Sequence, residues 1–234
     1  MKIARRNGSV HVPAGVAKLV TVADSKPAAA RLVGSSPTSG TMARTNRTTL
    51  AYLIGVALGD GNLSNPNGRA VRLRISCCLD YPKVAKEIER SIHTLLPHNR
   101  ISTVRKRTAR CVDISVYSNV LAEWMPWRAS AGSKIEQGAH VPEWIFERPT
   151  YMRACLRGLF QTDGCIYSDR GYQMVHFTNT IHELAHDAHR MLTELGFRPT
   201  ISKIPNEARG KYVVRLARKT EVAKALRELA LYKE

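Results

Sequence analysis

An internal repeat is the feature that most constrains the fold of this chain. A helix-like stretch at residues 50–59 ends in Asp60-Gly61, and a second one at residues 151–162 ends in Asp163-Gly164. The two Asp-Gly pairs lie 103 residues apart, and the segments that follow them keep the same offset. Self-similarity of this kind indicates two copies of one supersecondary unit in tandem.

The segments after each Asp-Gly pair alternate between strand-like and helix-like patterns. Alternating apolar and polar residues predict strands, and apolar residues at helical spacing predict helices. These segments are residues 71–76, 84–96, 101–104, 111–117 and 119–127 in the first half, and residues 173–178, 184–195, 200–204, 212–216 and 220–229 in the second. We interpret each half as α-β-β-α-β-β-α, which places one further strand directly after each Asp-Gly pair. We predict an α+β fold in which two tandem repeats are related by a pseudo-twofold axis.

The repeats divide the chain into four parts. We expect a basic low-complexity tail at residues 1–45, a first repeat at 46–130, a connector at 131–148 and a second repeat at 149–234. Residues 1–41 hold six basic residues, one acidic residue and no sustained apolar period. A disordered tail, an organellar transit peptide and an over-extended reading frame all fit this composition. We favour the first or the third, because Met42 directly precedes the patterned region.

The charge of the chain limits its partners. It holds 36 lysines and arginines against 19 aspartates and glutamates, which gives a formal net charge of +17. Such an excess favours a polyanionic partner, and nucleic acid is the first candidate. No apolar run approaches the roughly 18 residues that a membrane helix needs, so we expect no membrane-spanning segment.

The five cysteines indicate a reducing compartment. Their number is odd and they form no C-x-x-C pair, which disfavours both a disulfide framework and a cysteine zinc site. We expect an intracellular protein of the cytoplasm or nucleoid, or an organellar one if residues 1–41 are a transit peptide.

Small residues at matching places in the two Asp-Gly helices predict that these helices pack on each other. Gly55 and Gly158 each lie five residues before the aspartate, and Gly59 and Thr162 each lie one residue before it. The i, i+4 spacing puts the small residues on one stripe, where two helices can approach closely. The glycine after each aspartate permits a sharp exit from the helix.

Helices packed in this way bring Asp60 and Asp163 together. A single Asp-Gly is a common turn, but two in register inside a duplicated unit favour a functional site. Two neighbouring carboxylates repel each other unless a cation neutralises them. Their hard oxygen atoms suit Mg²⁺, and we assign the preceding residues, Gly59 and Thr162, to the same metal site. A divalent metal beside a basic surface is the apparatus of phosphodiester hydrolysis.

With these two motifs, at residues 53–61 and 156–164, the chain resembles the LAGLIDADG homing endonucleases in their single-chain form. The second motif is the closer match, whereas the first departs from the pattern at residues 56–58 but keeps the glycine and the final Asp-Gly. The resemblance covers the chain from Thr49 to its C-terminus. It implies that the motif helices join the two halves and that their acids bind catalytic Mg²⁺, for which Mn²⁺ substitutes. It also implies that antiparallel sheets form a saddle on duplex DNA.

The resemblance further implies a monomeric enzyme that cuts both strands of a long, pseudo-palindromic target. Additional polar site residues are expected near the end of the second strand, where residues 179–180 stand in the second half and Cys78 and Asp80 in the first. A catalytic lysine is expected just after the fourth strand. Lys219 takes that place in the second half, whereas the first half offers Ser118.

Alternation along the strands separates an apolar face from a basic one. Arg72 and Arg74 point away from the apolar residues of their strand, and Lys211 and Arg215 do the same in theirs. An arginine-bearing sheet face suits insertion into a DNA groove, and arginines around a strand turn can hold phosphates. The residues that we expect to contact DNA are Arg72, Arg74, Arg105, Arg107, Arg110, Asn179, Lys203, Lys211 and Arg215.

One segment fits a different chemistry. Residues 182–186 read His-Glu-Leu-Ala-His, the H-E-x-x-H pattern of zinc proteases, and His189 adds a third imidazole. The segment falls on the second helix of the second repeat, on the side opposite the apolar residues of that helix. The glycine and third ligand that follow this pattern in some zinc proteases are not found after it. We therefore interpret it as the polar side of an amphipathic helix, and a measured zinc content decides the matter.

The favoured function is site-specific, Mg²⁺-dependent cleavage of double-stranded DNA by an intron-encoded type of enzyme. Two alternatives keep the fold: an RNA maturase that assists intron splicing, with intron RNA as partner, and a non-cleaving DNA-binding regulator. The presence of both acids argues against a purely binding role. The sequence specifies neither the DNA target nor whether the host element is an intron or an intein.

A chain that begins at Met42 should fold and cut DNA like the full chain, because residues 1–41 offer no apolar face that could pack. Thermal unfolding and cleavage of the two chains side by side check this expectation. Loss of cooperative unfolding in the shorter chain would show that the tail belongs to the fold.

Overall fold

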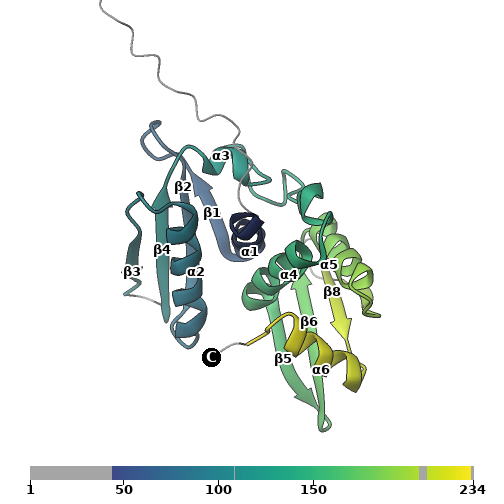
Figure 1. The fold of residues 1–234 in the computed structure, drawn as a ribbon. Coiled ribbons are helices and arrows are strands. Elements are labelled where there is room, and N and C mark those ends of the chain that lie inside the picture. Colours follow the sequence, from purple (N-terminus) through teal and green to yellow (C-terminus); the bar gives the residue numbers. More distant parts are fainter. Residues whose placement is uncertain (1–43, 108, 206–209, 233–234) are drawn as a thin grey trace, which may run out of the picture. The chain divides into compact units, whose positions relative to one another are not determined.

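The computed structural model describes residues 44–107, 109–205 and 210–232, so residues 1–43 of the expected tail lie outside it. Its elements, in chain order, are α1 (Arg44–Asp60), β1 (Gly61–Ser64), β2 (Arg72–Cys78), α2 (Pro82–Leu95), β3 (Ser102–Arg105), β4 (Cys111–Tyr117), α3 (Leu121–Trp124), η1 (Glu143–Ile145), α4 (Pro149–Asp163), β5 (Gly164–Asp169), β6 (Tyr172–Asn179), α5 (His182–Glu194), β7 (Thr200–Ile204), β8 (Lys211–Leu216) and α6 (Lys219–Glu228) (Figure 1). Within these residues no helix is both long and apolar enough to cross a bilayer.

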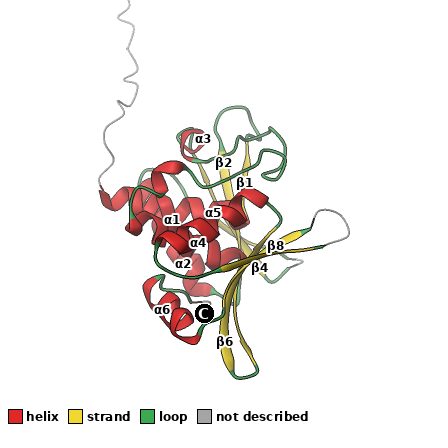
Figure 2. Ribbon diagram, turned by 90° about the vertical axis from the view of Figure 1, so that its right-hand side faces the viewer, coloured by secondary structure: helices red, strands yellow, loops and turns green. Residues whose placement is uncertain are grey.

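The predicted α+β fold of two repeats is confirmed. Each repeat builds one antiparallel four-stranded sheet, with strand order β1-β2-β4-β3 in the first and β5-β6-β8-β7 in the second. The strands that the repeat formula requires directly after each Asp-Gly are β1 and β5, which begin at Gly61 and Gly164. The helices gather on one side of the strands, which leaves the other side of each sheet open (Figure 2).

The closing helix of the first repeat is shorter than the sequence predicts. The pattern indicates a helix over residues 119–127, but α3 covers only Leu121–Trp124. Met125 already has extended backbone angles, φ −87° and ψ 138°, and Pro126 follows it. A proline disfavours the helical conformation in the residue before it, so the helix ends there.

The strands alternate as predicted between a buried and an open face. In β2, Leu73 and Ile75 are fully buried, whereas Arg72 and Arg74 are partly exposed. In β8, Lys211 and Arg215 are exposed and Val214 and Leu216 are buried. The second sheet departs from strict alternation at Val213, which is also buried although it lies on the open side.

Helices α1 and α4 cross at the two glycines, as the small-residue stripe predicts. A Cβ atom added to Gly55 would lie 2.1 Å from the carbonyl oxygen of Cys155. One added to Gly158 would lie 2.5 Å from the carbonyl oxygen of Tyr52 and 2.6 Å from the backbone nitrogen of Val56. Because these neighbours are backbone atoms, only glycine permits the contact.

The glycines after the aspartates allow the sharp exit for a reason of space. Gly164 is extended, with φ −86° and ψ 161°, and Gly61 is not among the residues with positive φ. Their function is spatial: an added Cβ at Gly61 would lie 2.4 Å from the Ala57 carbonyl oxygen, and one at Gly164 would lie 2.4 Å from that of Phe160. Each strand therefore leaves its helix too close to the preceding turn for any side chain.

A polar cluster at the helix crossing ties the two repeats together. Glu87 of α2 pairs with Arg157 of α4 at 2.8 Å, accepts a 3.1 Å hydrogen bond from Gln161 Nε2, and accepts another from the Tyr232 hydroxyl. Gln161 in turn accepts a 2.7 Å hydrogen bond from the hydroxyl of Tyr52, whose pKa is raised by burial. Buried polar groups are tolerated when they are bonded in this way.

Replacing Gly158 by alanine should destabilise the protein by about 1–3 kcal/mol, the usual cost of overpacking, because one methyl group would meet the α1 backbone. In an open helix interior the same change would instead stabilise by roughly 1 kcal/mol. Urea-induced unfolding measures the difference. As a control, Ala223→Leu on the exposed face of α6 should change stability by less than about 0.5 kcal/mol. A Gly158→Ala protein that is more stable than the natural one would contradict the helix crossing.

Candidate active site

The two acids of the repeated motif emerge from adjoining helix ends. A Cβ atom added to Gly59 would lie 2.1 Å from Thr162 Oγ1 and 3.2 Å from Asp163 Oδ2. The residue before Asp60 thus faces the end of α4 directly, as the pairing of Gly59 with Thr162 predicts. Asp60 is exposed and Asp163 is half-buried.

This arrangement is electrostatically unfavourable by itself. The C-terminal end of a helix carries a partial negative charge, which repels an acid and attracts a cation. Neither α1 nor α4 has a basic residue in its last turn. The positive charge that stabilises Asp60 and Asp163 must therefore come from other parts of the chain or from a bound ion.

Asn179, at the end of β6, holds the second acid. Its Nδ2 donates a 2.7 Å hydrogen bond to Asp163 Oδ2, and its Oδ1 accepts a 2.8 Å hydrogen bond from the backbone nitrogen of Ile181. The second bond fixes which way the amide points. Asn179 thus lies beside Asp163 and contacts it directly.

Lys134 of the connector lies at the same place, and nothing in the sequence indicated it. Its Nζ donates hydrogen bonds to the carbonyl oxygens of Ala57 at 3.2 Å, Leu58 at 2.7 Å and Gly59. Burial lowers the pKa of Lys134 to about 8, while the charges of Asp163 and Asp60 act in the opposite direction. The ammonium is therefore mostly protonated at neutral pH.

Two unlike cavities flank the acids. One of about 240 Å³ is lined by Asp163, Asn179, Thr180 and Lys134, among others. The other, of about 80 Å³, is lined by Asp60, Ser76, Cys78, Tyr81 and several apolar residues. The site is therefore asymmetric although the fold is nearly symmetric.

Two further predicted site residues lie apart from these cavities. Asp80 pairs with Arg110 at 2.5 Å, and that hydrogen bond holds the pKa of the carboxyl below its usual value. Lys219 is the first residue of α6, and its side chain is exposed. Neither residue lines the cavity beside the acid of its own repeat.

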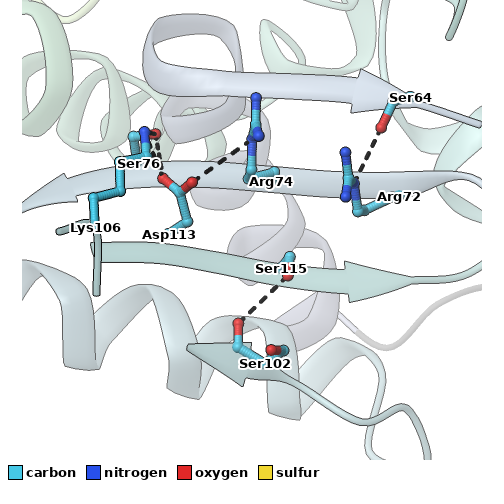
Figure 3. Close-up of polar contacts among 8 residues, drawn as sticks. All are labelled: Ser64, Arg72, Arg74, Ser76, Ser102, Lys106, Asp113 and Ser115. Atoms are coloured by element: carbon cyan, nitrogen blue, oxygen red, sulfur yellow. Dashed lines mark hydrogen bonds and ion pairs between the residues drawn. The ribbon is translucent and has the colours of Figure 1, made fainter. Parts of the chain in front are cut away.

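The open face of the first sheet carries an organised set of charges (Figure 3). Asp113 of β4 accepts a 2.6 Å hydrogen bond from Ser76 and pairs with Lys106 at 3.1 Å and with Arg74 at 4.0 Å. Burial acts to raise the pKa of Asp113, but the hydrogen bonds from Ser76 and Lys106 outweigh it and lower that pKa. On the same face, Arg72 Nε donates a 3.1 Å hydrogen bond to Ser64.

The remaining basic residues fall into separate groups. Arg105, Arg107 and Arg110 line a concave surface around the β3–β4 turn. Lys211 and Arg215 lie on the open face of the second sheet.

The strand register separates Lys203 from Lys211 and Arg215, the other basic strand residues of this sheet that we expect to contact DNA. Lys203 is paired with Tyr212 in the ladder of β7 and β8, and its Nζ lies 5.6 Å from the centre of that ring. The ring also meets His182 and His186 of α5, so Lys203 lies on the side that the helix covers.

The histidine-rich segment forms the start of α5. The rings of His182 and His186 lie 4.2 Å apart and both contact Tyr212. In the part of the chain that the structure describes, no three histidine, cysteine or acidic side chains gather so as to hold a metal. Around Asp60 and Asp163 as well, these two acids have no third such side chain gathered with them among the described residues.

Comparison with protein families places both halves in one group. Residues 49–114 match the WhiA LAGLIDADG-like domain and residues 150–230 match the LAGLIDADG-like domain. The two matches together cover most of the chain and contain both Asp-Gly motifs. The chain therefore belongs to the LAGLIDADG family, with one domain of that kind in each half.

Solved structures share this fold. Variants of the homing endonuclease I-DmoI superpose with a TM-score of 0.57 at 21% identity, which covers 81% of this chain and 99% of that one. Full-length DUF199/WhiA from Thermatoga maritima superposes with a TM-score of 0.58 at 13% identity, which covers 83% of this chain and 59% of that one. At these identities the likeness shows the fold.

Sequence relatives are parts of longer proteins. A DNA polymerase of Thermococcus hydrothermalis is 30% identical over 164 residues, which are 68% of this chain and 9% of the polymerase. The tRNA-splicing ligase RtcB of Methanopyrus kandleri is 27% identical over 184 residues, which are 68% of this chain and 18% of the ligase. The chain thus spans less than a fifth of these relatives.

Proposed function

We propose that the chain is a site-specific endonuclease that binds double-stranded DNA and cleaves both strands as a monomer. The observation that supports the proposal is that Asp60 and Asp163 stand at the adjoining ends of two helices that cross through glycines. With one acid from each repeat in a shared site, one chain would hold what a symmetric dimer supplies from two.

The donors of this site fit Mg²⁺. Asp60 and Asp163 offer carboxylate oxygens, the ligands that this ion prefers, and they lie where a positive charge is required. Gly59 and Thr162 are the further candidate ligands; the Gly59 carbonyl accepts from Lys134, and the Thr162 hydroxyl donates within its own helix. A bound divalent ion would stabilise charge on the phosphate and activate water. Mn²⁺, which also suits carboxylate sites, is expected to substitute.

The side chains around the acids would perform the rest of the chemistry. Asn179 holds Asp163 in one orientation through a fixed amide. Lys219 keeps the proposed catalytic lysine position, and its exposure at the start of α6 leaves it accessible to DNA. Asn179 has no amide counterpart in the first repeat, where Cys78 lines the cavity beside Asp60, so the two strands would be cut in unlike surroundings.

Charge and sheet faces support DNA as the substrate. The net charge of +17 favours a polyanion. Arg72 and Arg74 lie on one open face and Lys211 and Arg215 on the other, an arrangement that suits insertion into DNA grooves. The β3–β4 turn arginines are placed for phosphate contacts. Binding should therefore weaken steeply as salt rises.

The sequence relatives support the view that this domain pair is a module inserted into unrelated proteins. Proteins named as a DNA polymerase, a tRNA-splicing ligase and, in Bacillus subtilis, a ribonucleoside-diphosphate reductase subunit match this chain over 9%, 18% and 16% of their lengths. Three unrelated activities cannot owe their chemistry to the same small segment, so that segment is best explained as an insertion. I-DmoI has been solved in complex with DNA and Ca, with DNA and Mn, and with its target DNA in the presence of Mg, which agrees with a metal-dependent nuclease.

A non-cleaving DNA-binding regulator is the second candidate. It is favoured by the match of the first half to the WhiA LAGLIDADG-like domain and by the fold of WhiA. It would use the same basic faces without the chemistry of the acids.

Asp60→Asn and Asp163→Asn should each slow cleavage by roughly 100-fold or more, because a major electrostatic element of the site is lost, and leave DNA affinity within about threefold. Sites are first selected from a randomised duplex library by the full chain and then tested for Mg²⁺-dependent cleavage. Glu123→Gln, an exposed acid of α3, is the matched control. Cleavage by either aspartate variant at the natural rate would contradict the assignment. Binding without cleavage in any divalent ion would favour the regulator, and preference for intron RNA would favour a maturase.

A further inference from the structure

Lys134 is the residue at the acid pair that neither the repeat nor the strand pattern assigns. It comes from the connector between the two domains, yet its ammonium bonds to three consecutive carbonyl oxygens in the last turn of α1. These are the carbonyls that a helix end leaves without intrahelical partners or shares with the next segment. Its Nζ also lies 5.5 Å from the ring centre of Trp127.

The loop that carries Lys134 is built to hold it in place. Ser133 and Glu136 exchange hydrogen bonds, with the backbone nitrogen of each donating to the side chain of the other at 2.7 and 3.2 Å. The Gln137 side chain closes the loop through three bonds to the backbone of Arg128 and Gly132. A flexible linker would need none of these contacts. The loop therefore fixes the position from which Lys134 reaches α1.

Different side chains contact the C-terminal ends of α1 and α4. At α4, the Thr162 hydroxyl donates to carbonyl oxygens of its own helix and Asn179 donates to Asp163. At α1 the corresponding residue is Gly59, which has no side chain because Thr162 occupies that space. Lys134 instead brings hydrogen-bond donors from the connector to carbonyl oxygens among the last four of α1.

We propose that Lys134 is a positioning residue of the nuclease site: it closes the carbonyl end of α1 and supplies the resident positive charge that faces Asp60 and Asp163. The proposal rests on the proposed function for its catalytic consequence. All three ammonium hydrogens are directed at the backbone, so Lys134 acts through the placement of α1 and its acid. The connector thereby becomes part of the active site.

A stability cycle tests this proposal without any cleavage. If Lys134 faces Asp60, then removing the acid relieves more repulsion when the lysine is absent. Asp60→Asn should therefore raise the melting temperature by about 2–6 °C more in a Lys134→Met background than in the natural chain. Changes of this size are the usual effect on melting temperature of a modest change in the free energy of unfolding. Lys134→Arg, which keeps the charge, should preserve the natural response. Lys86→Met, an exposed lysine of α2, should do so as well.

The effect of Ca²⁺ on the melting temperature tests the positive charge of Lys134 independently. Ca²⁺ should raise the melting temperature of Lys134→Met by more than that of the natural chain, because the ion replaces the missing cation. A lysine that merely packs would give equal shifts with either background and with or without Ca²⁺, and that result would overturn the proposal.

Cleavage then separates this inference from the proposed function. With DNA affinity within about twofold, Lys134→Met should cut at least tenfold more slowly than the natural chain under single-turnover conditions, and Lys134→Arg should recover part of the rate. Natural-rate cleavage by Lys134→Met would also overturn the proposal. If the natural chain does not cut, the proposed function fails, and the stability cycle still decides whether Lys134 faces the acids.

Discussion

The close approach of α1 and α4 is the contact on which the rest of the molecule depends. Gly55 and Gly158 let each backbone lie against the other, with carbonyl and amide atoms where side chains would normally stand. A helix pair this close has little freedom to rotate or slide, because interiors pack at high density. The ends of the two helices are consequently fixed in relation to each other, and the ends carry the acids.

This proximity creates a charge problem that the chain solves asymmetrically. Two carboxylates stand at the negative ends of two helix dipoles, an arrangement that needs neighbouring positive charge or hydrogen-bond donors. Asn179 donates a hydrogen bond to Asp163, and Lys134 donates hydrogen bonds to carbonyl oxygens at the end of α1. Such a pair carries an electrostatic cost, and the proposed catalytic function accounts for its presence.

The repeat itself made much of the fold predictable. Two copies of one pattern confirm each other, so the elements, the buried strand faces and the helix crossing could all be inferred from residue types and spacing. Predictions failed where tertiary geometry overrides local pattern. Pro126, for example, ends α3 earlier than the apolar pattern indicates. The sheet face on which Lys203 lies was not predictable from the sequence, because only the register of β7 against β8 separates it from Lys211.

In the candidate site, the repeat made the adjoining positions of the two acids predictable, but not the connector residue beside them. Asp60 and Asp163 recur in register, whereas Lys134 occurs once, in a connector without periodicity, and reaches the site through a loop whose hydrogen bonds leave no pattern in the sequence. The central claim is that both acids hold one divalent ion. Anomalous diffraction from crystals grown with Mn²⁺ tests it most directly. The account predicts a manganese peak bonded to carboxylate oxygens of both Asp60 and Asp163. A peak at only one acid, or one at His182 and His186 with none between the acids, would contradict it.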